Sequence, residues 1–191
     1  MYKRQDEHYY ESLDWFWNNL ERYDAYDRNA SEVYVGEYAV HDEQRRTTLR
    51  SAIAEAAFMT SVERNGDIVA MTSYAPLLAK IGRTQWNPNL IYFNNTEVFP
   101  TLNYWVQQLF ARNFGDSYLA TEVTDGNETG RLAISTVRHE ASGDIILKIV
   151  NGDAEVKPLR LRLPGLAFSP TAQVTIPVSY THLTLPTKRI V

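Results

Sequence analysis

Hydrophobic and polar positions in the first half of the chain follow two different periods. From Leu13, apolar residues recur at every third or fourth position, and the alanine-rich segment 47–64 repeats this spacing. Both segments are therefore predicted to be helices with one apolar face. The short apolar runs 33–35 and 68–71 are typical of strands that are buried on both faces. This alternation of strand and helix predicts parallel β/α units.

The same alternation of apolar runs and helical repeats continues to residue 115. Residues 90–93 form a short apolar run that predicts an extended piece. Pro100 precedes a further helical repeat, whose apolar positions run to Phe110, and the turn-forming residues 113–115 end it. We therefore assign residues 1–115 to an α/β region.

The pattern changes after Gly115. Residues 132–139, 145–151 and 156–163 have the composition of strands, and turn-forming triplets separate them. An antiparallel meander is the expected arrangement. The chain is thus predicted to be α/β plus all-β, with a second region over 116–176 and a boundary between residues 115 and 120.

The α/β region is too short to close on itself. Its pattern contains two clear strand–helix units, whereas a closed parallel barrel needs eight strands. We expect the chain to be a fragment of a longer protein, or a partner to cover its apolar surface. The last segment, 177–191, resembles translated sequencing-adapter sequence, although its alternating pattern also allows a last strand.

Composition and charge exclude several classes of function. The chain of 191 residues has a net charge of -4 and scattered basic residues, so no nucleic-acid partner is expected. It has no cysteine, its four histidines lie far apart in sequence, and no glycine-rich phosphate loop is present. We therefore expect neither a metal nor a nucleotide cofactor. The first ten residues lack the apolar core of a signal peptide, and no segment predicts a membrane span.

Glu37 is the first candidate for chemistry. It directly follows the apolar run 33–35, and catalytic groups in parallel α/β folds project from the carboxyl ends of strands. A solvated loop carboxylate is the competing interpretation, and position alone does not decide between them.

Several stretches resemble the α-L-arabinofuranosidases of glycoside hydrolase family 51, in matching order and spacing. They are VYVGEYAV (33–40), DEHYY (6–10), LRSAIAEAAFMTSVERNGDIVAMTSYAPLLAK (49–80) and WNPNLIYF (86–93). Residues 146–163 resemble, more loosely, the accessory β-sandwich that follows the barrel in that family. The resemblance implies the C-terminal portion of a (β/α)8 TIM barrel followed by an antiparallel β-sandwich domain.

The resemblance also implies roles for particular residues. Glu37 would be the catalytic nucleophile, His8 and Tyr10 would line the sugar site, and Trp86 would lie near the sugar, with packing roles as the alternative for these last three. The family's acid/base is the Glu of an Asn-Glu pair on an earlier strand, which precedes the part of the barrel matched here. The pair Asn127-Glu128 lies in the expected sandwich and is not its counterpart.

The function implied is retaining hydrolysis of terminal α-L-arabinofuranosyl residues from plant polysaccharides, with an arabinose-containing polysaccharide or oligosaccharide as partner. No cofactor, nucleic acid or membrane is expected, a homo-oligomer of the longer enzyme stays open, and a periplasmic or extracellular location is favoured over the cytoplasm. The 191-residue chain by itself is expected to be inactive. Two alternatives remain: another retaining barrel glycosidase, such as an endoglucanase or xylosidase, or a non-catalytic carbohydrate-binding module, which the 12 Tyr and 4 Trp residues would suit.

Overall fold

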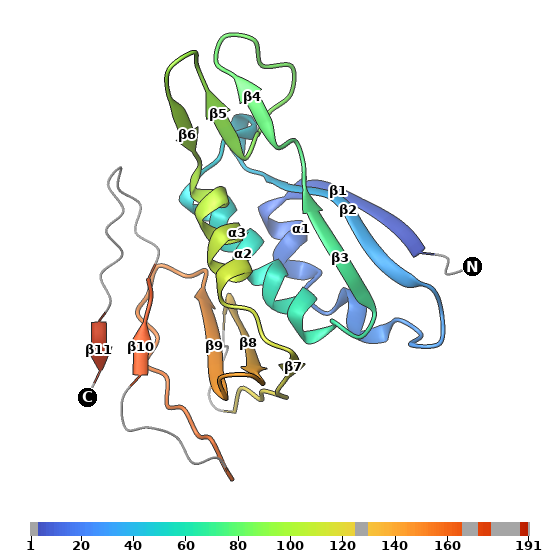
Figure 1. Cartoon of the computed structure of the whole chain (residues 1–191), viewed down its shortest axis with the longest axis vertical. Coiled ribbons are helices and arrows are strands. Elements are labelled where there is room, and N and C mark those ends of the chain that lie inside the picture. The colour runs from blue at the N-terminus through green and yellow to red at the C-terminus, as the bar shows by residue number, and fades with distance from the viewer. Residues whose placement is uncertain (1–3, 125–129, 166–171, 177–187, 191) are drawn as a thin grey trace. The chain divides into compact units, whose positions relative to one another are not determined.

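The computed structural model of the chain describes residues 4–124, 130–165, 172–176 and 188–190 (Figure 1). The chain forms two compact units, Met1–Asp153 and Ala154–Val191. The first unit contains a parallel sheet, its helices, a small three-stranded sheet and an antiparallel meander. In the second unit, β10 (Ala172–Val174) pairs antiparallel with β11 (Lys188–Ile190).

The parallel sheet has the strand order β1-β2-β3. Its strands are β1 (Arg4–Ser12), β2 (Glu32–His41) and β3 (Val69–Tyr74). The helix predicted over 47–64 is present and connects β2 to β3, so the predicted parallel unit is confirmed. The hydrophobic pattern did not predict β1, because charged and polar side chains fill most of its positions.

The described residues form three α-helices, and α2 contacts both of the others. Each begins after a hydroxyl side chain that accepts a hydrogen bond from a backbone N–H of the first turn. They are α1 (Leu13–Asn18), α2 (Leu49–Arg64) and α3 (Leu102–Arg112). The first helix is shorter than its apolar repeat suggested, because the chain continues as the 3-10 helix η1 (Arg22–Ala25). A second 3-10 helix, η2 (Glu43–Arg45), precedes α2.

Helix α2 is shared by two hydrophobic cores. Ala54 and Phe58 belong to the core under the parallel sheet, where the Phe58 ring contacts the rings of Phe16 and Tyr38 at centroid distances of 5.3 and 5.4 Å. Ala52 and Ala57 belong to a second core, which α2 forms with α3 and the meander. The small alanine side chains allow close packing on both sides of this helix.

A small three-stranded sheet lies between β3 and α3 in the sequence. Its strands are β4 (Leu78–Lys80), β5 (Ile91–Phe93) and β6 (Val98–Pro100). β4 runs parallel to β5, and β6 runs antiparallel to it. The extended piece predicted at 90–93 is confirmed as β5.

The meander consists of β7 (Ser117–Tyr118), β8 (Leu132–His139) and β9 (Asp144–Asn151), all antiparallel. The two longer strands were predicted correctly. The strand predicted at 156–163 is wrong, since the backbone there is irregular. Val156 and Leu161 are exposed, so the apolar alternation of this segment does not bury a face.

The meander packs on α2 and α3 within the same compact unit, through Ala133 and Val150. A domain boundary between residues 115 and 120 stays a prediction. Of the expected adapter-derived tail, 177–187 and 191 lie outside the described residues, as does the pair Asn127-Glu128.

Candidate functional site

The parallel sheet has two different faces. One face carries buried side chains that pack on the helices, among them Tyr9, Val33 and Val35. The other face carries the more exposed polar side chains of Asp6, His8 and Tyr10. We call this second face the open face.

Glu37 reaches the open face because β2 contains a bulge. Val33 and Val35 point to the helices, so strict alternation would send the side chain at position 37 to the same buried face. The pairing of β1 with β2 skips one residue, because Glu7 lies opposite Val35 and His8 lies opposite Glu37. The additional residue reverses the alternation and places Glu37 beside His8.

Gly36 is the residue that the bulge skips, and only glycine fits there without rearrangement. A Cβ atom at this position would collide with Asp6 Oδ1 and would lie 3.2 Å from His8 Nε2. The requirement comes from the close approach of neighbouring side chains.

Two side chains contact the Glu37 carboxylate on the open face. The Tyr10 hydroxyl donates to Glu37 Oε2 at 2.6 Å, and His8 Nδ1 lies 3.6 Å from the same oxygen. On its other side, His8 Nε2 lies 3.2 Å from Asp6 Oδ2. The imidazole ring therefore lies between two carboxylates, and Glu37 keeps its side chain 44% exposed.

Tyr10 is held as a neutral hydrogen-bond donor. Partial burial raises the pKa of its hydroxyl, and the hydrogen bond to Glu37 and the negative charge of that carboxylate raise the pKa further. The ring of Tyr10 also stacks on the ring of His41, at a centroid distance of 5.7 Å. Tyr10 thus fixes one oxygen of Glu37 and leaves the other available.

Trp86 lies apart from this cluster. It belongs to the loop between β4 and β5, its side chain is 62% exposed, and its backbone carbonyl accepts a hydrogen bond from Asn89 Nδ2. Within the described part of the chain, no hydrogen bond or ring contact joins it to His8, Tyr10 or Glu37. Its place in a sugar site stays a prediction.

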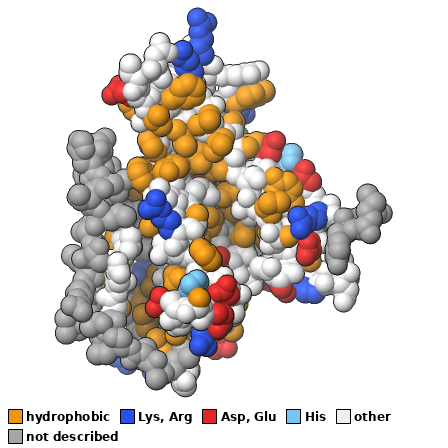
Figure 2. All heavy atoms as spheres, viewed as in Figure 1, with side chains coloured by type: hydrophobic (Ala, Val, Ile, Leu, Met, Phe, Trp, Pro, Cys, Tyr) orange, Lys and Arg blue, Asp and Glu red, His pale blue; other side chains and the backbone are white. Residues whose placement is uncertain are grey.

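Hydrophobic side chains gather on the surface of the small sheet formed by β4, β5 and β6 (Figure 2). The exposed large side chains of this segment are Leu77, Leu78, Ile81, Trp86, Val98 and Phe99. An apolar surface of this kind marks a region that another molecule or another segment covers.

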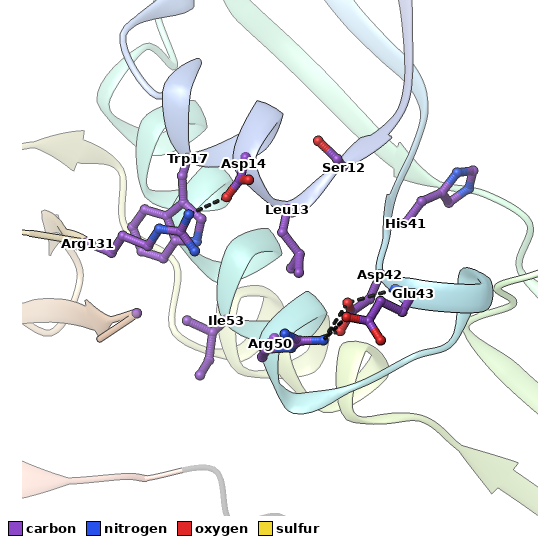
Figure 3. Close-up of a pocket in the computed structure, with 11 residues that line it drawn as sticks. Ser12, Leu13, Asp14, Trp17, His41, Asp42, Glu43, Arg50, Ile53 and Arg131 are labelled. Carbon is purple, nitrogen blue, oxygen red and sulfur yellow. Dashed lines mark hydrogen bonds and ion pairs between the residues drawn. The ribbon is translucent and has the colours of Figure 1, made fainter. Parts of the chain in front are cut away.

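A cavity of about 370 Å³ lies at the ends of β1 and β2 and is lined largely by residues of α1, η2 and α2 (Figure 3). In the close-up, Leu13 lies between two charged groups, the Asp14–Arg131 ion pair on one side and Asp42 with Arg50 on the other. His41 lines the cavity and also stacks on Tyr10, so it joins the cavity to the cluster around Glu37.

The described residues contain no group of three or more His, Cys, Asp or Glu side chains placed to hold a metal ion. Among the helices that the structure describes, none is long and apolar enough to cross a membrane.

Two residues of the site were missed by sequence reasoning. Asp6 stands two positions before His8, and on a strand this spacing places both side chains on one face. That signal was present in the stretch DEHYY. The need for glycine at position 36 had no such signal, because it depends on how two strands pair.

Comparisons with known proteins identify the family. The family model described as the α-L-arabinofuranosidase C-terminal domain matches residues 36–184. An extracellular exo-α-L-arabinofuranosidase of Streptomyces chartreusis is 44% identical over 136 residues, which cover 69% of this chain and 16% of that protein. Alpha-L-arabinofuranosidase 1 of Arabidopsis thaliana is 35% identical over 163 residues, covering 84% of this chain and 24% of that protein. The chain therefore spans a quarter or less of the length of these curated relatives.

Solved structures give the same result. A family 51 α-L-arabinofuranosidase with bound arabinose superposes with a TM-score of 0.73 at 37% identity, covering 81% of this chain and 26% of that chain. The arabinose complex of an α-L-arabinofuranosidase from Thermotoga maritima has a TM-score of 0.61 at 14% identity, covering 78% of this chain and 38% of that chain, and shows likeness of fold alone.

These similarities confirm the predicted fold class, which is the C-terminal portion of a (β/α)8 barrel followed by a β-sandwich. The family model covers well over half of the chain and includes Glu37. The chain belongs to the α-L-arabinofuranosidases of glycoside hydrolase family 51.

Proposed function

We propose that this chain supplies the nucleophile and part of the sugar site of a retaining α-L-arabinofuranosidase. The enzyme would release terminal α-L-arabinofuranosyl residues from plant polysaccharides. The observation that carries the proposal is the contact of Glu37 with Tyr10 at 2.6 Å, beside His8, on a strand face that the helices leave open. Membership of the family supports the assignment of the reaction.

The geometry suits a carboxylate nucleophile. A retaining glycosidase forms a covalent glycosyl-enzyme by attack of one carboxylate oxygen on the anomeric carbon, while a carboxylic acid protonates the departing oxygen. The Tyr10 hydroxyl donates a hydrogen bond to Oε2 of Glu37 and orients the carboxylate, so the other oxygen can attack. In the second step, water attacks the anomeric carbon and frees the Glu37 carboxylate.

The second carboxyl group is proposed to come from a longer protein. Retaining enzymes hold their two carboxyl groups about 5 to 5.5 Å apart. Asp6 and Glu37 both contact His8, and the ring of His8 lies between the two carboxylates. We therefore expect that the acid/base is the Glu of an Asn-Glu pair on an earlier barrel strand.

The substrate and location follow from the relatives. The solved family 51 relative at 37% identity holds bound arabinose, which supports an arabinose-containing polysaccharide or oligosaccharide as the substrate. The Streptomyces chartreusis relative is named an extracellular enzyme, and this name supports an exported location for the enzyme proposed here. Trp86 would add an aromatic face to the sugar site.

The test is an activity assay on the 191-residue chain and on a longer protein from the same reading frame, with an aryl α-L-arabinofuranoside as substrate. The short chain should be inactive, and the longer protein should turn over with retention of configuration. Glu37→Gly in the longer protein should abolish turnover, and added azide should restore it with an inverted glycosyl azide as product.

Glu32→Gly is the matched control, because Glu32 lies at the other end of β2 and pairs with Arg4. Its activity should equal that of the unchanged protein. Full turnover by the 191-residue chain would overturn the proposal of a missing acid/base, and Asp6 would then be the first carboxylate to replace.

A further inference from the structure

A buried carboxyl group lies under the strand that carries Glu37. Glu55 is in the middle of α2 and its residue is fully buried. Its Oε1 accepts a hydrogen bond of 3.0 Å from the backbone N–H of Val40, which is three residues after Glu37 on β2. A buried carboxyl group is costly unless it makes such a bond.

The hydrogen bond of Val40 replaces a missing part of the sheet. The Tyr38 carbonyl accepts from the backbone N–H of Ala75, so the Tyr38 backbone groups point toward β3. Backbone groups two residues apart on a strand point to the same side, and the Val40 N–H therefore points that way too. β3 has ended at Tyr74, and Glu55 accepts the hydrogen bond at the place that a longer strand would occupy.

The part of β2 just before Glu37 is irregular. The pairing with β1 shifts between Glu7 and His8, and the pairing with β3 shifts between Val35 and Tyr38. From Glu37 to His41, β2 pairs regularly with β1 on one side. On the side of β3, the hydrogen bond between the Val40 N–H and Glu55 adds a second hold on this segment.

Other buried polar groups surround Glu55. Four buried polar atoms lack a hydrogen-bond partner within the described residues: Glu55 Oε2, Tyr74 Oη, Asn103 Nδ2 and Gln107 Nε2. The Gln107 carbonyl oxygen accepts from the Tyr38 hydroxyl at 2.8 Å. We call Tyr38, Glu55, Tyr74, Asn103 and Gln107 the Glu55 cluster, which joins β2, β3, α2 and α3. Buried polar groups in this arrangement are expected to serve a purpose other than stability, since apolar side chains would fill the same space at lower cost.

Burial raises the pKa of Glu55 to about 8, although the Val40 N–H and the amides of Asn103 and Gln107 lower it. The titratable groups that face Glu55 are Tyr38 from β2 and Tyr74 from β3, and α3 contributes uncharged amides. Burial raises the pKa values of both tyrosines as well, so both stay neutral where Glu55 titrates. A protonated, uncharged Glu55 is therefore the form at neutral pH.

We propose that Glu55 is a positioning residue for Glu37, which holds the carboxyl end of β2 through the hydrogen bond that it accepts from the Val40 N–H. The link to catalysis rests on the function proposed above, whereas the hold on β2 does not. Glu55 does not contact substrate. It acts by keeping the bulged strand in the position at which Tyr10 can reach Glu37.

The first experiment uses nuclear magnetic resonance on the 191-residue chain over about pH 5 to 9. The Val40 amide resonance should shift with a midpoint near the pKa of Glu55, about 8. Glu55→Gln keeps an acceptor oxygen and cannot ionise, so the shift should disappear while the Val40 amide stays protected from exchange. Glu55→Leu should make that amide exchange up to about tenfold faster, as expected for one lost hydrogen bond.

Glu63→Gln is the matched control, because Glu63 lies on the same helix but bonds Ser135 and Lys148 of the meander. It should leave the titration of Val40 and the ring resonances of Tyr10 unchanged, whereas Glu55→Leu should shift the latter. An unchanged Val40 titration in Glu55→Gln, or unchanged exchange in Glu55→Leu, would overturn the hold on β2.

The second experiment measures kcat and KM of the longer enzyme. Glu55→Gln keeps the acceptor oxygen and should keep kcat, and Glu55→Leu should lower kcat more than it changes KM. A kcat that is the same in Glu55→Leu and in the unchanged enzyme would overturn the catalytic part of the inference. If the longer protein has no activity at all, the proposed function fails, and the resonance experiment still decides whether Glu55 holds β2.

Discussion

The two faces of the parallel sheet are built from the same three strands but differ in burial and polarity. The face toward the helices is closed, because Val33, Val35 and the ring of Phe58 form a continuous core there. The open face holds His8, Tyr10 and Glu37, whose contacts are polar and whose side chains remain accessible. The closed face therefore determines whether the sheet folds, and the open face determines what it can do.

The two faces also differ in the surroundings of their carboxylates. Glu7, on the closed face, is buried and accepts hydrogen bonds from the hydroxyls of Tyr9 and Tyr26, with Arg22 at 3.6 Å. Glu37, on the open face, accepts from Tyr10 and keeps an exposed oxygen. A carboxylate whose oxygens all accept hydrogen bonds stabilises the fold, whereas a carboxylate with an oxygen free of hydrogen bonds can react.

The largest effect is expected from removing a ring from the closed face. Phe58→Ala should lower the free energy of unfolding by about 3 to 5 kcal/mol, because it leaves a cavity among four aromatic rings. The measurement is denaturant unfolding of the chain. Met71→Ala is the control on β3, 46% exposed, and should change the free energy by less than about 0.5 kcal/mol. Equal losses for both variants would contradict the distinction between the faces.

A smaller effect is expected at the bulge that separates the faces. Gly36→Ala should cost about 1 to 3 kcal/mol, because the added methyl group displaces Asp6 and His8. Tyr10 should then lose its contact with Glu37, which the ring resonances of Tyr10 would report. Gly66→Ala provides the comparison, since its Cβ would meet only the Glu63 carbonyl, at 3.6 Å. If Gly36→Ala leaves both stability and the Tyr10 signals unchanged, the bulge does not depend on glycine.

The smallest effect on stability is expected on the open face itself. Glu37→Gln should change the free energy of unfolding by less than about 1 kcal/mol, because the hydrogen bond it makes is exposed. It should lower the pKa of Tyr10, since a neutral amide no longer opposes ionisation of the phenol. The pKa should stay above its usual value, because burial is the largest cause of its increase.

Titration of the Tyr10 ring resonances checks this expectation, with Glu32→Gln as the control that removes a distant charge from the same strand. A Tyr10 pKa that is the same with and without the Glu37 charge would show that the two groups do not interact in solution.

The amino-acid sequence by itself determined the parallel unit of β2, α2 and β3, because apolar periodicity reports directly which face of an element is buried. It also determined the meander of β8 and β9, and, through resemblance, the family and the candidate residue Glu37. The prediction of a strand at 156–163 was wrong, because apolar alternation forms a strand only where a neighbouring strand can pair with it.

Only the tertiary structure decided which way Glu37 points. The alternation of Val33 and Val35 would have buried it, and the bulge at Gly36 reversed that direction through the register between β1 and β2. The role of Glu55 was likewise invisible in sequence, because it depends on a neighbour from another element, the Val40 N–H. Periodicity is a local property of the chain, whereas register and hydrogen-bond partners arise only when distant segments pack together.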